Sequence, residues 1–192
     1  MSRRRLALGL LAAGLLLAPL LAPRAGRRDP GPEAGPLVRL LGPVARLAAS
    51  VQWVRVEEAR AAGEHELAFA RAETALALDP GATAGWLSLA RYQGLYLASA
   101  TRQPDPGLRR QWLVEAVATT RRGEELARAP AELAVLRALL LLEHAQREPP
   151  TPWPGGAAAL WAEAALAFER AAELGHAGGH ELARRTRERA GG

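Results

Sequence analysis

The chain has 192 residues, of which 49% are hydrophobic and only 5% aromatic, and it contains no cysteine. The lack of cysteine excludes disulfides, thiolate metal sites, cysteine nucleophiles and a lipid-modified amino-terminal cysteine. The net charge of +5 is concentrated in residues 1–36, where six arginines and two acidic residues give +4 and leave +1 for the rest. A nucleic-acid-binding domain needs a basic face to neutralise phosphates, so this nearly neutral body argues against nucleic acid as a partner.

Residues 1–23 are predicted to enter a membrane. Arg3–Arg5 precede an uncharged apolar run over residues 6–22, which as a helix spans about 26 Å, close to the ~30 Å hydrocarbon core. A cut after Ala22 places Leu20 where signal peptidase needs a small residue. We therefore expect an uncleaved single-pass anchor with the following domain on the extracytoplasmic side. The alternative is a secreted or periplasmic protein released by signal cleavage.

Two further observations concern the origin and the boundaries of the domain. All 25 basic residues are arginine, which together with abundant Ala and Gly indicates a GC-rich, bacterial coding sequence. Residues 24–36 are rich in proline, glycine and charge, which predicts an extended tether. Residues 37–175 form the predicted helical domain, and residues 176–192 a polar tail or short capping helix.

The composition of Ala, Leu, Arg, Glu and Gly favours helices, and six are expected in the domain. The first, over 44–62, has Leu47, Val51, Val54 and Glu58 at helical spacing and a stop at Gly63. The second, over 64–78, has an apolar face of Leu67, Ala68, Ala72, Ala75 and Leu76, and ends at Asp79-Pro80-Gly81.

The remaining helices follow the same pattern. The third covers 83–99 with a seam of Trp86, Leu89, Ala90, Tyr96 and Leu97, and the fourth covers 106–128 with Trp112, Leu113, Ala116, Val117 and Thr120. The fifth, over 131–147, is almost uncharged and is expected to be the buried central helix. The sixth, over 157–174, carries Leu160, Trp161, Ala164, Ala165, Phe168 and Ala171. The predicted fold class is therefore all-α.

The spacing of small residues and stop signals resembles the tetratricopeptide repeat, a helix–turn–helix unit of 34 residues. The positions that match its packing and stop residues are Gly63, Ala68, Ala75, Pro80, Trp86, Leu89, Phe168 and Ala171. The resemblance implies an α-solenoid of about three antiparallel helix pairs, interrupted by insertions at 98–107 and 148–156.

In that family the first helices of successive units line a concave groove that holds a peptide or a partner helix. The resemblance places Ser50, Trp53, Glu57, Arg60, Leu87 and Arg91 in this groove. Trp53 is also compatible with packing in the core. Trp153, in a proline-rich loop, either covers the core or serves as a docking anchor for a partner. The implied function is a membrane-tethered adaptor for a protein or peptide partner. The alternative is a structural subunit of an envelope assembly, such as a secretion, pilus or division complex, without a groove.

A catalytic function is not expected. The sequence has no glycine-rich phosphate loop, nucleophile elbow or paired core carboxylates, so we expect no cofactor and no small-molecule substrate. His176 and His180 are four residues apart and, with Glu173 or Glu181, raise the possibility of a metal-dependent enzyme. Because Gly178-Gly179 interrupt that segment, we expect these histidines to be exposed in a loop.

Overall fold

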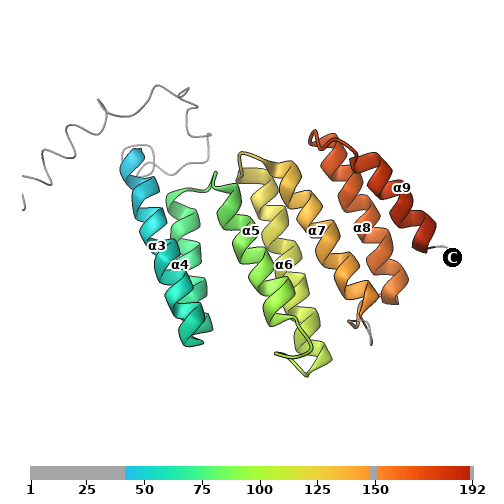
Figure 1. The fold of residues 1–192 in the computed structure, drawn as a ribbon, viewed down its shortest axis with the longest axis horizontal. Coiled ribbons are helices and arrows are strands. Elements are labelled where there is room, and N and C mark those ends of the chain that lie inside the picture. Colours follow the sequence, from blue (N-terminus) through green and yellow to red (C-terminus); the bar gives the residue numbers. More distant parts are fainter. Residues whose placement is uncertain (1–41, 148–150, 191–192) are drawn as a thin grey trace, which may run out of the picture.

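The computed structural model describes residues 42–147 and 151–190 (Figure 1). These residues form seven α-helices and one short π-helix and no β-strand, which confirms the all-α prediction for the described part of the chain. The predicted anchor at 1–23 and tether at 24–36 lie outside the described residues. Within 42–147 and 151–190, no helix is long and apolar enough to cross a membrane.

The first helix pair is α3 (Pro43–Ala62) and α4 (His65–Leu78). Gly63 ends α3 in the left-handed region, with φ of 76°, which glycine adopts without steric cost. Its N–H donates to the Arg60 carbonyl, and the Glu64 N–H donates to the Ala59 carbonyl, so the last carbonyls of α3 are satisfied. This tight turn reverses the chain and brings α4 alongside α3 (Figure 1).

Small side chains form the contact between α3 and α4. The buried residues of the pair are mostly alanine: Ala45, Ala49, Val56 and Ala59 on α3, and Ala68, Ala72, Ala75 and Leu76 on α4. Alanine lets two helix backbones approach closely, and such an interface loses little side-chain entropy on folding. Leu67, which the pattern placed on the packing face of α4, is 40% exposed because Ala68 and Ala72 make the close contact and leave Leu67 at its edge.

The apolar residues that indicated the first helix lie on its outer face. The helix is present, but Leu47, Val51 and Val54 are 68%, 47% and 61% exposed. They point away from the alanine face that contacts α4. The sequence has apolar residues on both sides of α3, and the close approach of α4 selects the side with the smaller ones.

The second pair begins with α5 (Thr83–Arg91), which continues into the π-helix η1 (Tyr92–Leu97). The wider last turn is closed by the Ala98 N–H, which donates to the Gln93 carbonyl five residues earlier. Its partner α6 (Pro106–Leu126) begins after Asp105, whose carboxylate accepts hydrogen bonds from the N–H groups of Gly107 and Leu108. Proline in the first turn and this carboxylate together fix the start of α6.

α7 (Pro130–Gln146) is the central helix of the second half of the array, as predicted. It packs against α6 on one side and α8 on the other, and its buried residues include Leu133, Leu136, Leu140 and Leu141. His144 is fully buried on α7; its Nε2 donates to the Gly94 carbonyl, and its Nδ1 accepts from the Thr151 hydroxyl, both at 2.7 Å. The histidine therefore ties α7 to η1.

The chain ends with α8 (Gly156–Glu173) and α9 (Gly179–Ala190). Gly175, with φ of 95°, ends α8 by the same hydrogen-bonding pattern that Gly63 uses after α3. α9 buries only Gly179, Ala183 and Thr186 and exposes arginines and glutamates along the rest of its length. The sequence left open a polar tail or a short capping helix for residues 176–192, and residues 179–190 form a helix in the structure.

Of the eight packing and stop positions that the repeat pattern singled out, six lie in the interior, whereas Gly63 is exposed in the turn after α3 and Pro80 is half-buried. Ala68, Ala75, Trp86, Leu89, Phe168 and Ala171 are all buried. The indole N–H of Trp86 donates to the Pro80 carbonyl at 2.8 Å, which fixes the turn between α4 and α5.

Aromatic side chains join the first helix pair to the second. The ring of Phe69 on α4 stacks on Trp112 of α6 with 5.4 Å between centroids, and it lies tilted against Tyr92 of η1 at 6.0 Å. Direct contact between α4 and α5 is slight compared with the contact between α7 and α8. These large rings therefore contribute much of the apolar area at the first junction.

Candidate functional site

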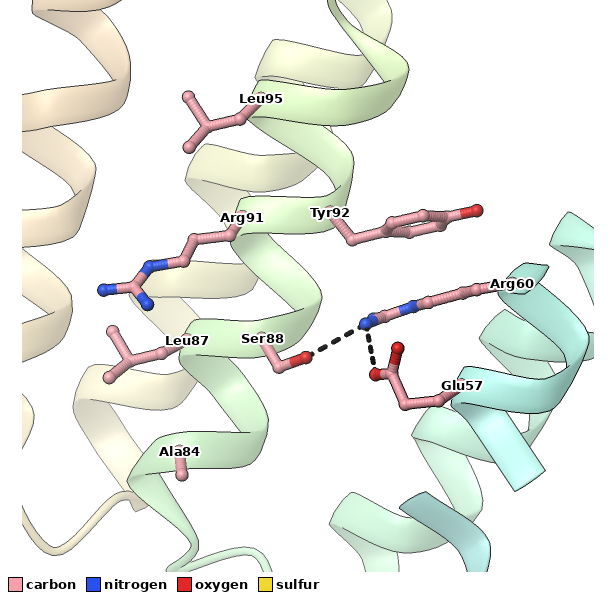
Figure 2. Close-up of a pocket in the computed structure, with 8 residues that line it drawn as sticks. All are labelled: Glu57, Arg60, Ala84, Leu87, Ser88, Arg91, Tyr92 and Leu95. Carbon is pink, nitrogen blue, oxygen red and sulfur yellow. Dashed lines mark hydrogen bonds and ion pairs between the residues drawn. The ribbon is translucent and has the colours of Figure 1, made fainter. Parts of the chain in front are cut away.

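An open cleft of about 500 Å³ lies between α3 and α5 (Figure 2). It is lined by Glu57 and Arg60 from α3 and by Ala84, Leu87, Ser88, Arg91, Tyr92 and Leu95 from α5 and η1. α3 and α5 are the first helices of two successive pairs. The cleft therefore lies where the two pairs meet.

Helical periodicity places the lining residues of α5 on one face. Ala84, Leu87, Arg91 and Leu95 recur every three or four residues, and the opposite side of α5 buries Trp86, Leu89 and Ala90 in the core. Burial of that opposite side fixes the rotation of α5 about its axis. The core of the second pair thereby directs the lining side chains into the cleft.

Arg60 forms part of the wall of the cleft. Its Nη1 donates to the Glu57 carboxylate at 2.8 Å and to the Ser88 hydroxyl at 3.0 Å (Figure 2). Its guanidinium lies 4.2 Å from the centroid of the Tyr92 ring, a cation–π contact. The side chain is only 12% exposed, and its Nε and Nη2 are buried with no hydrogen-bond acceptor within the described residues. Arg60 is thus a positive charge held in one orientation.

Tyr92 contacts the Arg60 guanidinium and helps to hold it in this orientation. Its hydroxyl is 2.6 Å from Nδ1 of His65 on α4, so the residue connects α4, η1 and the Arg60 side chain. Burial raises the pKa of Tyr92, and the neighbouring Arg60 cation opposes that rise. The phenol is therefore neutral at physiological pH and presents its ring face to the guanidinium.

The opposite wall carries an exposed cation between two aliphatic side chains. Arg91 is exposed, Leu87 is half-buried and Leu95 is 41% exposed. Figure 2 shows Leu87, Arg91 and Leu95 in sequence along the same side of the helix. With Arg60 and Glu57 included, the charges of the cleft sum to +1, so it favours an anionic group next to an apolar one.

The structure brings together four of the six residues predicted for the groove. Glu57, Arg60, Leu87 and Arg91 line the cleft, whereas Ser50 and Trp53 do not. Ser50 is exposed on α3, and its hydroxyl donates to the Arg46 carbonyl one turn earlier.

The two tryptophans whose roles the sequence left open both pack against the core. Trp53 is half-buried and packs against the apolar cluster that contains Val56 and Trp86. Trp153 is half-buried against the other cluster, and its indole N–H donates to Glu163 at 2.8 Å. Trp153 therefore covers the core at the entry to α8.

The sequence reasoning missed Ala84, Ser88, Tyr92 and Leu95. Ala84, Ser88 and Leu95 each lie three or four residues from Leu87 or Arg91, so the helical spacing around those two residues contained the signal for these three. The role of Tyr92 depends on Arg60, 32 positions away in the chain, and on the wider turn of η1. No local pattern indicates that contact.

The two histidines of the metal hypothesis lie at the junction of α8 and α9. His176 is half-buried in the turn, and His180 is exposed on the first turn of α9. The expectation of two exposed loop histidines is wrong in part: His176 lies in the turn but is half-buried, and His180 is exposed but belongs to α9, which begins at Gly179. In the described ranges, no group of three or more His, Cys, Asp or Glu side chains is placed to hold a metal ion.

No protein-family model, curated protein or solved structure matches this chain. The geometry of the cleft is therefore the basis for assigning a function.

Proposed function

We propose that the chain is a membrane-tethered, tetratricopeptide-like adaptor, without catalytic activity, that binds a segment of a partner protein in the cleft between α3 and α5. The observation that carries the proposal is that Glu57, Arg60, Leu87 and Arg91, chosen from the repeat pattern, line one cleft. The pairs α3–α4, α5–α6 and α7–α8, followed by the polar α9, fit three units and a cap, which is about the minimum for a stable solenoid.

The charges of the cleft indicate what the partner segment carries. Arg91 is exposed and has the planar fork that binds a carboxylate through two hydrogen bonds. Arg60 is already engaged by Glu57 and Ser88, so it acts as a fixed positive charge and not as the primary clamp. Leu87 and Leu95 offer apolar surface on either side of Arg91. A segment with an acidic residue beside an apolar one satisfies these features.

The proposed location of the helical domain next to a membrane rests on the sequence of residues 1–36. The apolar run 6–22 supplies the anchor, and the Pro- and Gly-rich residues 24–36 supply the tether. A tether of 13 residues spans at most about 45 Å when fully extended, which keeps the start of the proposed domain at residue 37 close to the bilayer surface. The partner is then expected at or near the extracytoplasmic face of a bacterial membrane.

Site-specific photo-crosslinking in the native membrane tests the proposal. A benzophenone amino acid replaces Leu95 in the cleft or, as a matched control, Leu166, which is 60% exposed on α8. The cleft position is expected to give a discrete crosslinked product that the control position does not give. Arg91→Glu in the same chain is expected to reduce that product at least five-fold with an unchanged melting temperature, because the Arg91 side chain is exposed.

Two results would count against the adaptor. If positions 95 and 166 gave the same products, the cleft would have no selectivity. If position 95 gave none while position 166 crosslinked to a neighbouring subunit, the structural-subunit alternative would be preferred. Mass spectrometry of the product from position 95 identifies the partner.

A further inference from the structure

The outer face of α3 carries a continuous aliphatic stripe. Val44, Leu47, Val51 and Val54 are 38%, 68%, 47% and 61% exposed, and all lie on the side away from α4. Their side chains account for four of the large hydrophobic residues exposed in the described part of the chain. We call these four residues the α3 stripe.

The spacing of the α3 stripe is that of a helix-packing seam. Its residues are separated by three, four and three positions, which is the alternation of the two apolar positions in a heptad. An aliphatic ridge with this period packs into the grooves of another helix, whereas a strand or an irregular peptide does not match it. The stripe spans about 15 Å of helix axis.

The stripe lies at one end of the array, and the two ends differ in character. α3 is the first described helix, so α4 covers only its inner side, while the other end is closed by α9 (Figure 1). The exposed surface of α9 is charged, with ion pairs that join Arg184 and Arg185 to Glu181. End units of stacked helical proteins need a polar outer face of this kind, and α3 lacks one.

We propose that the α3 stripe packs against the α3 stripe of a second copy of this chain, with the two helices antiparallel. In that arrangement Val44 meets Val54 of the other copy and Leu47 meets Val51, so every layer is aliphatic and the contact is self-complementary about a twofold axis. No other sequence is needed to complete the seam.

Glu58 favours the antiparallel direction. It continues the seam four residues beyond Val54, and it forms no ion pair within the described residues. A parallel pair would place two Glu58 carboxylates opposite each other. An antiparallel pair instead places each Glu58 near the first turn of the other α3, which has no side-chain cap and no acidic residue. The positive end of the helix dipole there attracts a carboxylate.

The small area of the contact predicts a weak dimer. Four aliphatic side chains bury much less than the ~800 Å² per partner of standard stable complexes, so the dimer is expected to be reversible and concentration-dependent. Glu58, which continues the stripe, makes an anionic lipid surface a poorer occupant than a second helix.

Disulfide trapping in the full-length chain tests this pairing, because the natural chain has no cysteine. Val44→Cys and Val54→Cys, carrying tags of different size, are prepared separately, mixed in mild detergent and oxidised. The mixture is expected to form a mixed disulfide dimer at least five-fold more abundant than the homodimer of either variant alone. Leu166→Cys on α8, whose exposure of 60% matches the 61% of Val54, is the control for random collision. Adding Leu47→Glu to both variants is expected to reduce the mixed dimer to the Leu166→Cys level with unchanged circular dichroism.

Three outcomes would overturn the proposal. Homodimers of Val44→Cys as abundant as the mixed dimer would mean a parallel pair, and a mixed dimer no more abundant than the Leu166→Cys control would mean no pair. A polarity-sensitive fluorophore on Val51→Cys identifies the other occupants. A shielded fluorophore in phosphatidylcholine vesicles, without crosslinking, would assign the stripe to lipid. A shielded fluorophore in a monomer without vesicles would assign it to residues 1–41 of the same chain.

Discussion

The indole of Trp53 on α3 lies directly over Gly85 on α5, so close that a Cβ atom at position 85 would stand 2.6 Å from its Cζ2 atom. Leu76 of α4 would be 3.0 Å from the same Cβ. Gly85 therefore allows the first helix pair to dock on the second beside the cleft. The neighbouring helices α4 and α5 add only slight contact to this junction.

Gly85→Ala is expected to destabilise the protein by about 2 kcal/mol, because the added methyl group must push Trp53 or α5 out of place. Chemical denaturation followed by circular dichroism measures the loss. Gly81→Ala is the matched control: its Cβ would meet only the flexible, exposed guanidinium of Arg128, at 3.1 Å. Equal effects of the two substitutions would show that the contact between Trp53 and Gly85 is loose.

Ala68→Arg and Ala75→Arg are each expected to unfold the domain. Both alanines are buried where α4 crosses α3, at 1% and 0% exposure, and the crossing has no room for a long charged side chain. Ala70→Arg on the exposed side of the same helix is expected to melt like the parent. Circular dichroism distinguishes these cases, and parent-like melting of the buried variants would disprove a close crossing.

The stability of the protein is expected to fall in mild acid because of His144. Burial lowers the pKa of His144 from 6.5 to about 4, and this exceeds the opposing effect of its hydrogen bond to the Gly94 carbonyl. The unfolded chain therefore binds a proton in the range where the folded protein does not. The contribution is fully present above pH 6.5 and is lost as the pH falls toward 4, by about 3 kcal/mol in all.

His144→Gln separates this titration from that of the carboxylates. The variant is expected to be less stable at pH 7 by about 1 to 3 kcal/mol, since the bridge from η1 to Thr151 is altered. Its free energy of unfolding is expected to depend less on pH between 6.5 and 4 than that of the parent. Parallel curves for parent and variant would mean that His144 is accessible to protons in the folded state.

The ion pair between Glu124 of α6 and Arg137 of α7 is expected to show strong coupling. Its atoms are 2.8 Å apart, and both side chains are largely buried, at 8% and 11% exposure. Burial raises the pKa of Glu124 and lowers the pKa of Arg137, while each charge opposes the shift of the other. Removing Glu124 leaves the buried Arg137 charge without its partner, and removing Arg137 leaves the buried Glu124 carboxylate with only a 3.8 Å contact to Arg170.

A double-mutant cycle measures this coupling. Glu124→Ala and Arg137→Ala are each expected to cost about 3 kcal/mol, and the double variant less than their sum. The exposed pair of Arg184 and Glu188 on α9 is the control, where solvent screening is expected to make the coupling much weaker than between Glu124 and Arg137. Additive losses at Glu124 and Arg137 would mean that water screens the pair.

The ends of the helices could be predicted from local sequence. Gly63 stops α3 because it adopts a left-handed conformation, and Pro106 and Pro130 lie in the first turns of α6 and α7. These signals act within a few residues, so they do not depend on what the helix later packs against. The predicted and observed ends agree to within two residues except at η1, where the regular α-helix ends at Arg91.

The cleft was only partly predictable. The resemblance to the repeat placed Leu87 and Arg91 on the groove side of α5, but the orientation of Arg60 is set by Ser88 and Tyr92 from another part of the chain. The role of Trp53 was open in the sequence because an aromatic residue fits a groove as well as a core. Gly85, more than thirty positions later, supplies the space that makes it a packing residue.

The sequence by itself determined that this chain is helical and where its helices begin and end, because proline, glycine and capping residues act locally on the backbone. Only the tertiary structure decided which side of each helix faces inward. α3 has alanines on one side and larger aliphatic residues on the other, so hydrophobicity alone does not decide which side is buried. The close approach of α4 requires the smaller side chains, and that requirement buries Ala45, Ala49 and Ala59 and leaves Leu47, Val51 and Val54 on the surface.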